Sequence, residues 1–111
     1  MRSITEATFH ILLALADRPR HGLGVVDEVE ARTAGAVRLG PGVLYTTLKR
    51  LSDEGLVEET TERPDEESDD PRRRYYQLSA AGREVLAREA AKWAGAVAVA
   101  REKRVLEGGA R

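Results

Sequence analysis

The sequence predicts a mostly α-helical protein with one small β-hairpin, which places it in the α+β class. Apolar residues recur at the three- and four-residue spacing of helices in four separate stretches. Two short stretches, 56–62 and 73–78, instead alternate in polarity or carry paired tyrosines, as strands do. At 111 residues the chain fits one core of modest size, so we expect docking against a second subunit to add buried area.

The first two helices are expected over residues 3–17 and 21–33. Ser3 and Glu6 form a capping box at the start of the first helix. The expected apolar stripes are Ile4, Thr8, Ile11, Leu12 and Leu15 in the first helix and Leu23, Val26 and Val29 in the second. The stretch 37–39 that follows is long enough only for a small bridging strand.

The third helix has both of its ends marked in the sequence. Pro41 suits a first helical turn, where its missing N–H costs nothing, and Gly55 suits the left-handed position that closes a helix. Spacings of four and three predict a buried face made of Leu44, Leu48 and Leu51. The other sides of this helix carry Tyr45, Thr46, Lys49 and Arg50. One face therefore holds the helix, and another face is free to contact a partner.

The two predicted strands form a hairpin with a polar tip. Residues 64–71 contain no apolar side chain apart from a proline at each end, so we expect a solvated, disordered loop. Acids dominate from Glu58 to Asp70, whereas ten bases stand against four acids from Arg72 to Arg111. The net charge of −1 therefore hides two opposed blocks of charge.

A last, long helix follows Ser79, which suits an N-cap. Its apolar residues alternate spacings of four and three, which gives a narrow seam of the kind that packs against another helix. The seam consists of Leu86, Ala90, Trp93, Val97 and Ala100. Because residues 1–78 already form a complete compact unit, we expect residues 79–111 to be a dimerisation helix and tail, with the seam at the subunit interface.

Three short helices followed by a hairpin are the pattern of a winged helix-turn-helix. In that fold the third helix enters the major groove of DNA and the hairpin, or wing, lies along the backbone. Base edges are read by donors and acceptors, while phosphates are bound by cations and hydroxyls. The candidate DNA-contacting residues are Tyr45, Thr46, Lys49 and Arg50 on the helix and Arg72, Arg73 and Arg74 on the wing.

Each of these candidates also has a purely structural interpretation. Tyr45 could edge the core, Lys49 could be an ordinary solvated charge, and Arg50 could only pair with an acid. The arginine run could protect an edge strand from aggregation, and Trp93 could simply anchor a dimer interface. An enzyme, a cofactor or a metal site is not expected, because the chain has no cysteine, phosphate loop, nucleophile elbow or histidines at metal-ligand spacing. No stretch is long and apolar enough to span a membrane.

The sequence also resembles a known family. The runs GPGVLYTTLKRLSDEGLV at 40–57 and RRYYQLSAAGREVL at 73–86, together with HGLGV at 21–25, are similar to motifs of PadR-type bacterial transcriptional regulators. The resemblance covers essentially the whole chain. It implies a cytoplasmic homodimer that represses transcription from a palindromic operator, with a single C-terminal helix that makes the dimer.

The resemblance also implies roles for particular residues. By similarity, Tyr45 and Lys49 contact DNA from the recognition helix, and Arg73 and Arg74 contact it from the wing. Some family members stack flat aromatic ligands between paired tryptophans at the dimer interface, which gives Trp93 a second interpretation as the site of a small aromatic effector.

Two features of this chain depart from the family pattern. Leu23 stands where the family has tyrosine, so any hydrogen bond of that tyrosine is absent. The acidic run from Asp65 to Asp70 would repel phosphate, and we hypothesise that it swings clear of DNA while Arg72 to Arg74 stay engaged. Deleting the acidic run should then leave or improve DNA affinity at fixed salt, and a large loss would contradict the hypothesis.

Two other functions remain open from the sequence alone. One is a winged-helix protein-interaction module that does not bind DNA, which is compatible with the near-neutral total charge and the acidic wing tip. The other is a MarR-like regulator, disfavoured because such regulators usually carry more helix on either side of the wing.

Overall fold

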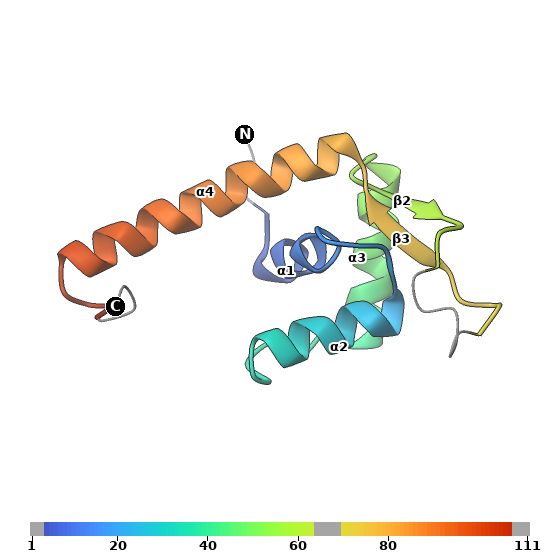
Figure 1. The fold of residues 1–111 in the computed structure, drawn as a ribbon, viewed down its shortest axis with the longest axis horizontal. Helices are drawn as coiled ribbons and strands as arrows, with labels where there is room; N and C mark the ends of the chain where they lie inside the picture. Colours follow the sequence, from blue (N-terminus) through green and yellow to red (C-terminus); the bar gives the residue numbers. More distant parts are fainter. Residues whose placement is uncertain (1–3, 64–69, 108–111) are drawn as a thin grey trace.

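The computed structural model describes residues 4–63 and 70–107. Within these residues the chain forms four helices and one three-stranded antiparallel sheet (Figure 1). The elements are α1 (Glu6–Ala14), β1 (Arg20–His21), α2 (Gly22–Arg32), α3 (Pro41–Asp53), β2 (Val57–Thr60), β3 (Tyr75–Leu78) and α4 (Ala80–Glu102). The predicted α+β class, with three helices ahead of a hairpin and one long helix after it, is confirmed.

The core lies between α1, α2 and α3, with the start of α4 packed on it. The predicted inward residues of α3 are nearly fully buried, and so are those of α1 apart from Ile4. They are Leu44, Leu48 and Leu51 in α3 and Thr8, Ile11, Leu12 and Leu15 in α1. In α2 the predicted Val29 is fully buried, but the prediction was wrong for Leu23, which is 52% exposed. Val25, one helical turn before Val29, faces the core instead.

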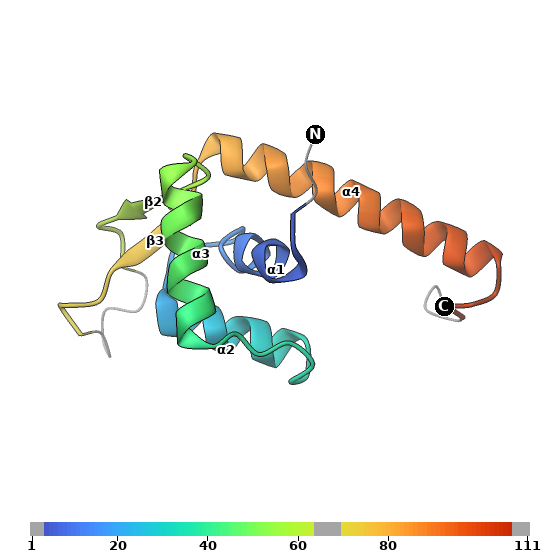
Figure 2. The ribbon, with the colours of Figure 1, turned by 180° about the vertical axis from the view of Figure 1, so that it is seen from behind.

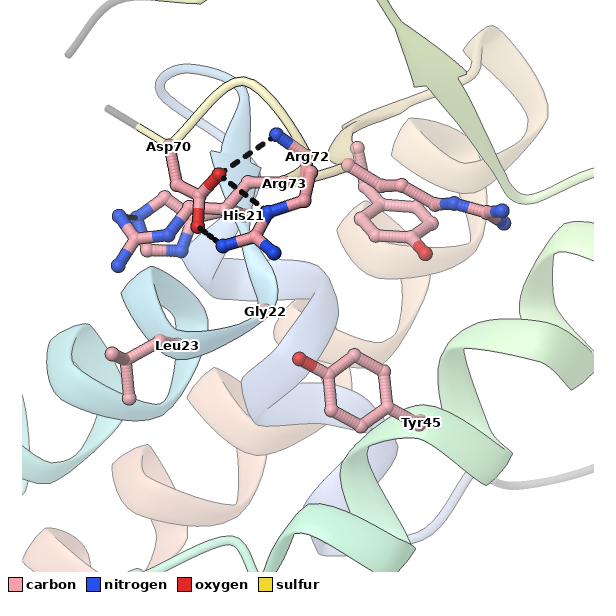
Figure 3. A pocket seen from close by; sticks show the side chains of 9 residues that line it. His21, Gly22, Leu23, Tyr45, Asp70, Arg72 and Arg73 are labelled. Carbon is pink, nitrogen blue, oxygen red and sulfur yellow. Dashed lines mark hydrogen bonds and ion pairs between the residues drawn. The ribbon is translucent and has the colours of Figure 1, made fainter.

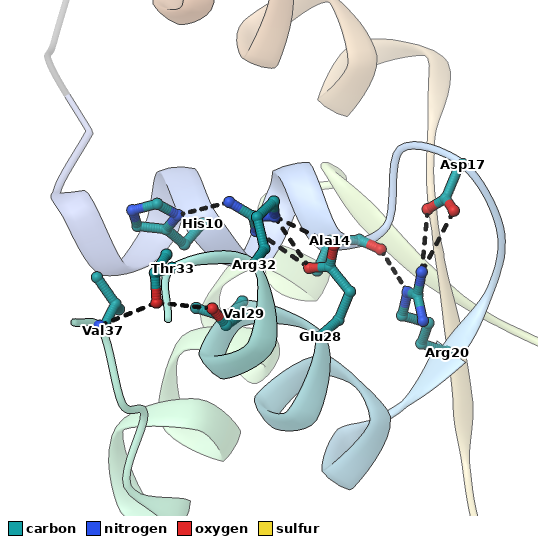
Figure 4. Close-up of polar contacts among 9 residues, drawn as sticks. All are labelled: His10, Ala14, Asp17, Arg20, Glu28, Val29, Arg32, Thr33 and Val37. Carbon is teal, nitrogen blue, oxygen red and sulfur yellow. Dashed lines mark hydrogen bonds and ion pairs between the residues drawn. The ribbon is translucent and has the colours of Figure 1, made fainter. Parts of the chain in front are cut away.

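The ends of α1 follow from local hydrogen bonds. The helix begins after Thr5, whose hydroxyl accepts a hydrogen bond from the Thr8 N–H at 3.1 Å, so Thr5 takes the capping role predicted for Ser3, which lies outside the described residues. The helix ends at Ala14 rather than at residue 17. Here Nε of Arg20 donates to the Ala14 carbonyl at 2.7 Å, taking the acceptor that a longer helix would use (Figure 4).

In the sheet, β3 is the central strand, with β1 on one side and β2 on the other. Between β1 and β3, Arg20 pairs with Tyr76 and His21 pairs with Tyr75. Between β2 and β3, the pairs begin with Val57 and Leu78 and end with Thr60 and Tyr75. The bridging strand is therefore Arg20–His21, and the prediction of a strand at 37–39 was wrong. That stretch is held to the end of α2, where the Val37 N–H donates to Oγ1 of Thr33 at 3.1 Å (Figure 4).

The start of α4 is joined closely to the end of α3. Ser79 caps α4 as predicted: its Oγ accepts from the Gly82 N–H at 3.0 Å, and its hydroxyl donates to the Gly55 carbonyl at 2.6 Å. Gly55 adopts the predicted left-handed conformation, with φ of 78°. A Cβ atom at Gly82 would overlap the Leu56 carbonyl oxygen, so the α4 backbone lies directly against the turn between α3 and β2.

Beyond this junction α4 crosses α1 and then runs on past the rest of the molecule (Figures 1 and 2). The radius of gyration is 15.4 Å, against about 13 Å for a compact chain of this length. Leu86, the first residue of the predicted seam, is 6% exposed and belongs to the core of its own chain. The domain boundary at residues 78 and 79 stays a prediction. None of the helices in the described ranges is long and apolar enough to cross a membrane.

The later part of the seam is only partly covered. Trp93 is 47% exposed, and one face of its indole stacks on Phe9 of α1 with 5.6 Å between ring centroids. Ala90, Val97 and Ala100 are half-buried, while Val99 beside them is 45% exposed. The second half of α4 therefore presents apolar surface that its own chain leaves open.

Candidate nucleic-acid interface

Helix α3 presents all four of its predicted residues to solvent. Tyr45 is 54% exposed, and Thr46 and Lys49 are exposed as well. The Lys49 Nζ lies 3.3 Å from Oδ2 of Asp53, one helical turn away. Such an exposed pair contributes little to stability, so the ammonium can exchange the carboxylate for another anion.

Arg50 has a different environment from the other candidates on α3. Its Nη2 donates to Oγ1 of Thr8 at 2.9 Å, and its Nη1 lies 3.6 Å from Oε2 of Glu54. The contact with Thr8 ties α3 to α1. Glu54 is an acid partner of Arg50, as one of the two predicted interpretations expected. A DNA contact by Arg50 stays a prediction, and the observed geometry favours the structural role.

Each of the three wing arginines contacts a polar side chain among the described residues. The contacts are Arg72 Nε and Nη2 with the Asp70 carboxylate at 3.2 and 3.1 Å, Arg73 Nη1 with His21 Nε2 at 3.1 Å, and Arg74 Nη1 with Glu59 Oε2 at 3.4 Å. The hydrogen bonds from Arg72 hold the pKa of Asp70 below its ordinary value, so this carboxylate is charged at neutral pH. Asp70 thus occupies Arg72 in the two-pronged manner that a phosphate would use.

An open groove of about 500 Å³ lies between the start of α2, the outward side of α3 and the wing (Figure 3). Its lining consists of His21, Gly22, Leu23, Tyr45, Asp70, Arg72, Arg73, Arg74 and Tyr76. The structure therefore brings four of the predicted residues together, namely Tyr45 and the three wing arginines. Lys49 lies in a neighbouring depression that also touches Tyr45, Glu59 and Arg74.

Two residues at the start of α2 belong to this groove although they were not among the predicted site residues. His21 caps α2, its Nδ1 accepting from the Gly24 N–H at 3.1 Å, and its other ring nitrogen faces Arg73. Gly22 lies under the ring of Tyr45, whose hydroxyl points toward it (Figure 3). His21 was predicted to begin this helix. Its contact with the wing joins residues 52 positions apart, so no local sequence pattern indicates it.

The groove is lined by groups that can bind an anion. Three guanidinium groups surround it, and burial, with a smaller effect of Glu59, raises the pKa of the Tyr76 phenol, which therefore stays protonated at neutral pH. In the ranges that the structure describes, no group of three or more His, Cys, Asp or Glu residues could hold a metal ion. These groups are hydrogen-bond donors of the kind that phosphate oxygens accept.

Helices α1 to α3, the β2–β3 wing and the exposed side of α3 define the winged helix-turn-helix class. The chain belongs to the Transcriptional regulator PadR-like family, whose model matches residues 11–88. The predicted family is therefore confirmed, and it is a family of transcriptional regulators, not of enzymes.

Several solved structures share this fold. A PadR family transcription regulator from hypervirulent Clostridium difficile superposes with a TM-score of 0.69 at 21% identity, covering 86% of this chain and 95% of that one. RosR of H. salinarum superposes with a TM-score of 0.66 at 27% identity, covering 94% and 88%. PadR of Bacillus subtilis, solved in complex with operator DNA, gives a TM-score of 0.62 at 19% identity, covering 75% and 45%.

A sequence relative is found in a mobile element. It is an uncharacterized 37.1 kDa protein in transposon TN4556 of Streptomyces fradiae, 44% identical over 85 residues. The match covers 77% of this chain and 22% of that protein, so the chain spans about a fifth of its relative's length.

Proposed function

We propose that this chain is a DNA-binding transcriptional repressor that acts as a cytoplasmic homodimer on a palindromic operator. The observation that carries the proposal is the groove that gathers Tyr45 and the three wing arginines beside the exposed side of α3. The B. subtilis relative of the same fold was solved with operator DNA, which supports this assignment.

In the proposed complex, α3 enters the major groove and the wing lies on the backbone. Lys49, Arg73 and Arg74 bind phosphates in this proposal. Among the described residues their side chains contact Asp53, His21 and Glu59, and these exposed or partly exposed contacts can be exchanged for phosphate. Arg72 reaches phosphate only by releasing Asp70, which already satisfies its guanidinium. Thr46 and Tyr45 complete the contact surface.

The proposed dimer buries the open part of the α4 seam, where Trp93 and Val97 lie, against the same seam of a second copy. A twofold dimer carries two recognition helices, which suits an operator made of two half-sites. By similarity with the family, a small aromatic effector would bind between the two Trp93 rings. It would act by changing the separation of the two recognition helices.

The test is binding to a labelled duplex from the region upstream of the protein's own coding sequence. We expect fluorescence anisotropy to show an affinity that falls steeply between about 50 and 200 mM salt, because bound phosphates release counterions. Light scattering should give the mass of a dimer. No binding at low salt would instead support the protein-interaction alternative, and a monomer mass would contradict the proposed dimer.

Replacing Gly22 by alanine is expected to weaken DNA binding by about fivefold to tenfold, the value of one hydrogen bond. The added Cβ would lie 2.5 Å from the Tyr45 hydroxyl oxygen and must push this ring out of place. Stability should change little, because the far end of a tyrosine can move. Gly24→Ala is the matched control, since its Cβ would meet the His21 ring at an ordinary 3.6 Å.

Anisotropy titrations and urea unfolding of the two glycine variants provide the measurement. Equal DNA affinities for Gly22→Ala and Gly24→Ala would show that the position of Tyr45 does not matter for binding.

A further inference from the structure

The first half of α3 carries no side chain that can make a two-pronged hydrogen bond to a base. Residues 39–48 read LGPGVLYTTL and contain no Arg, Lys, Asn, Gln, Asp or Glu. The N-terminal residues of a recognition helix are the ones that contact base edges, and guanine and adenine are read mainly by Arg, Lys, Asn and Gln. If α3 reads sequence, it must therefore use another kind of contact.

Two of the exposed side chains in this half of the helix, Val43 and Thr46, are small and carry methyl groups. Val43, the third helical residue, is apolar and yet 52% exposed. The core positions beside it are occupied by Leu44 and Leu48. Thr46 is exposed and lies one turn further on. The hydroxyl of Tyr45, by contrast, points toward Gly22 at the start of α2 (Figure 3).

The backbone between these side chains is open. An added Cβ at Gly40 or at Gly42 would meet no atom within 4 Å, so the start of α3 can approach a flat surface closely. Lys49, one turn beyond Thr46, supplies a cation on the same outward side of the helix. An apolar contact flanked by cations is complementary to bases flanked by phosphates.

We propose that Val43, with Thr46 beside it, reads the 5-methyl groups of thymines in the major groove. Thymine is the only one of the four bases that places a methyl group there, and apolar side chains are its usual partners. The inference rests on the proposed function and adds the residue that sets its sequence preference. Each half-site of the operator should therefore carry a thymine under the first turn of α3.

The test compares two versions of the duplex upstream of the coding sequence, one made with thymidine and one made with deoxyuridine, which lacks the methyl group. The wild-type protein should bind the deoxyuridine duplex about fourfold more weakly for each half-site, as expected for one methyl group removed from contact. Val43→Ala should discriminate less between the two duplexes than the wild type does. Val105→Ala is the matched control, because Val105 is 79% exposed beyond the end of α4, and it should discriminate as the wild type does.

A shuffled duplex of the same composition, with and without deoxyuridine, measures any effect of the substitution on nonspecific binding. Equal wild-type affinity for the two upstream duplexes, or full discrimination by Val43→Ala, would overturn the inference and leave the proposed function intact. A change of dimer mass in Val43→Ala would also overturn it, since Val43 would then lie in a subunit contact. Absence of wild-type binding to every duplex at low salt would overturn the proposed function itself.

Discussion

Replacing Gly82 by alanine is expected to destabilise the protein by about 1–3 kcal/mol, the usual cost of overfilling a packed site. In an open helix the same change is stabilising by about 0.5–1 kcal/mol, because glycine loses more conformational freedom on folding. At Gly82 the new methyl group would overlap the carbonyl oxygen and carbon of Leu56, and these backbone atoms cannot rotate away. To make room, α4 would have to lift from the turn that follows α3.

Gly95→Ala is the matched control for this variant. Gly95 lies in the same helix, thirteen residues beyond Gly82. It is nine residues beyond Leu86 and therefore on the side opposite the predicted seam, and its Cβ would meet no atom within 4 Å. We expect this variant to be more stable than the wild type. Urea unfolding at one fixed protein concentration measures both changes, and a Gly82→Ala variant as stable as Gly95→Ala would show that the α3–α4 junction tolerates added volume.

The second large effect is expected from the double variant Arg73→Gln and Arg74→Gln. If both arginines bind phosphate in each subunit of a dimer, the slope of log affinity against log salt should become shallower by roughly 3 to 4. Affinity at 0.1 M salt should fall by roughly 100- to 1,000-fold as a result. Arg72→Gln alone should have a smaller effect, because Asp70 already occupies that guanidinium.

Arg88→Gln serves as the control for lost charge, since Arg88 is an exposed cation on α4 whose partner in the helix is Glu84 at 3.9 Å. It should bind DNA like the wild type. An unchanged salt slope in the double variant would assign Arg73 and Arg74 to the edge-protecting role that the sequence also allowed.

The parts of the fold that could be predicted are those whose signals are local. Pro41 and Gly55 mark the ends of α3, and the spacing of its leucines identifies its buried face, so the structure agrees residue by residue. Helix α2 was harder because two overlapping stripes fit its sequence. The predicted stripe of Leu23, Val26 and Val29 and the observed pair of Val25 and Val29 both have helical spacing. Only packing against α1 decides between Leu23 and Val25.

The parts that could not be predicted depend on contacts between distant residues. Strand β1 is two residues long and exists only because β3 offers it a free edge. The site is partly local in the same sense. Tyr45 and the wing arginines were all named from the sequence, and they line one groove. The contact of Arg50 with Thr8 spans 42 residues, and it explains why a cation on the recognition helix is held away from that groove.

The junction at Ser79 makes α4 a lever for α3. The Ser79 N–H and hydroxyl donate to the carbonyls of Leu56 and Gly55, so the base of one helix is fixed to the end of the other. A helix of 23 residues is about 35 Å long, and a tilt of about 5° at its base displaces its far end by about 3 Å. Conversely, in the proposed dimer a small shift where the two α4 helices meet would turn α3 directly, without rearranging the leucine core of each subunit.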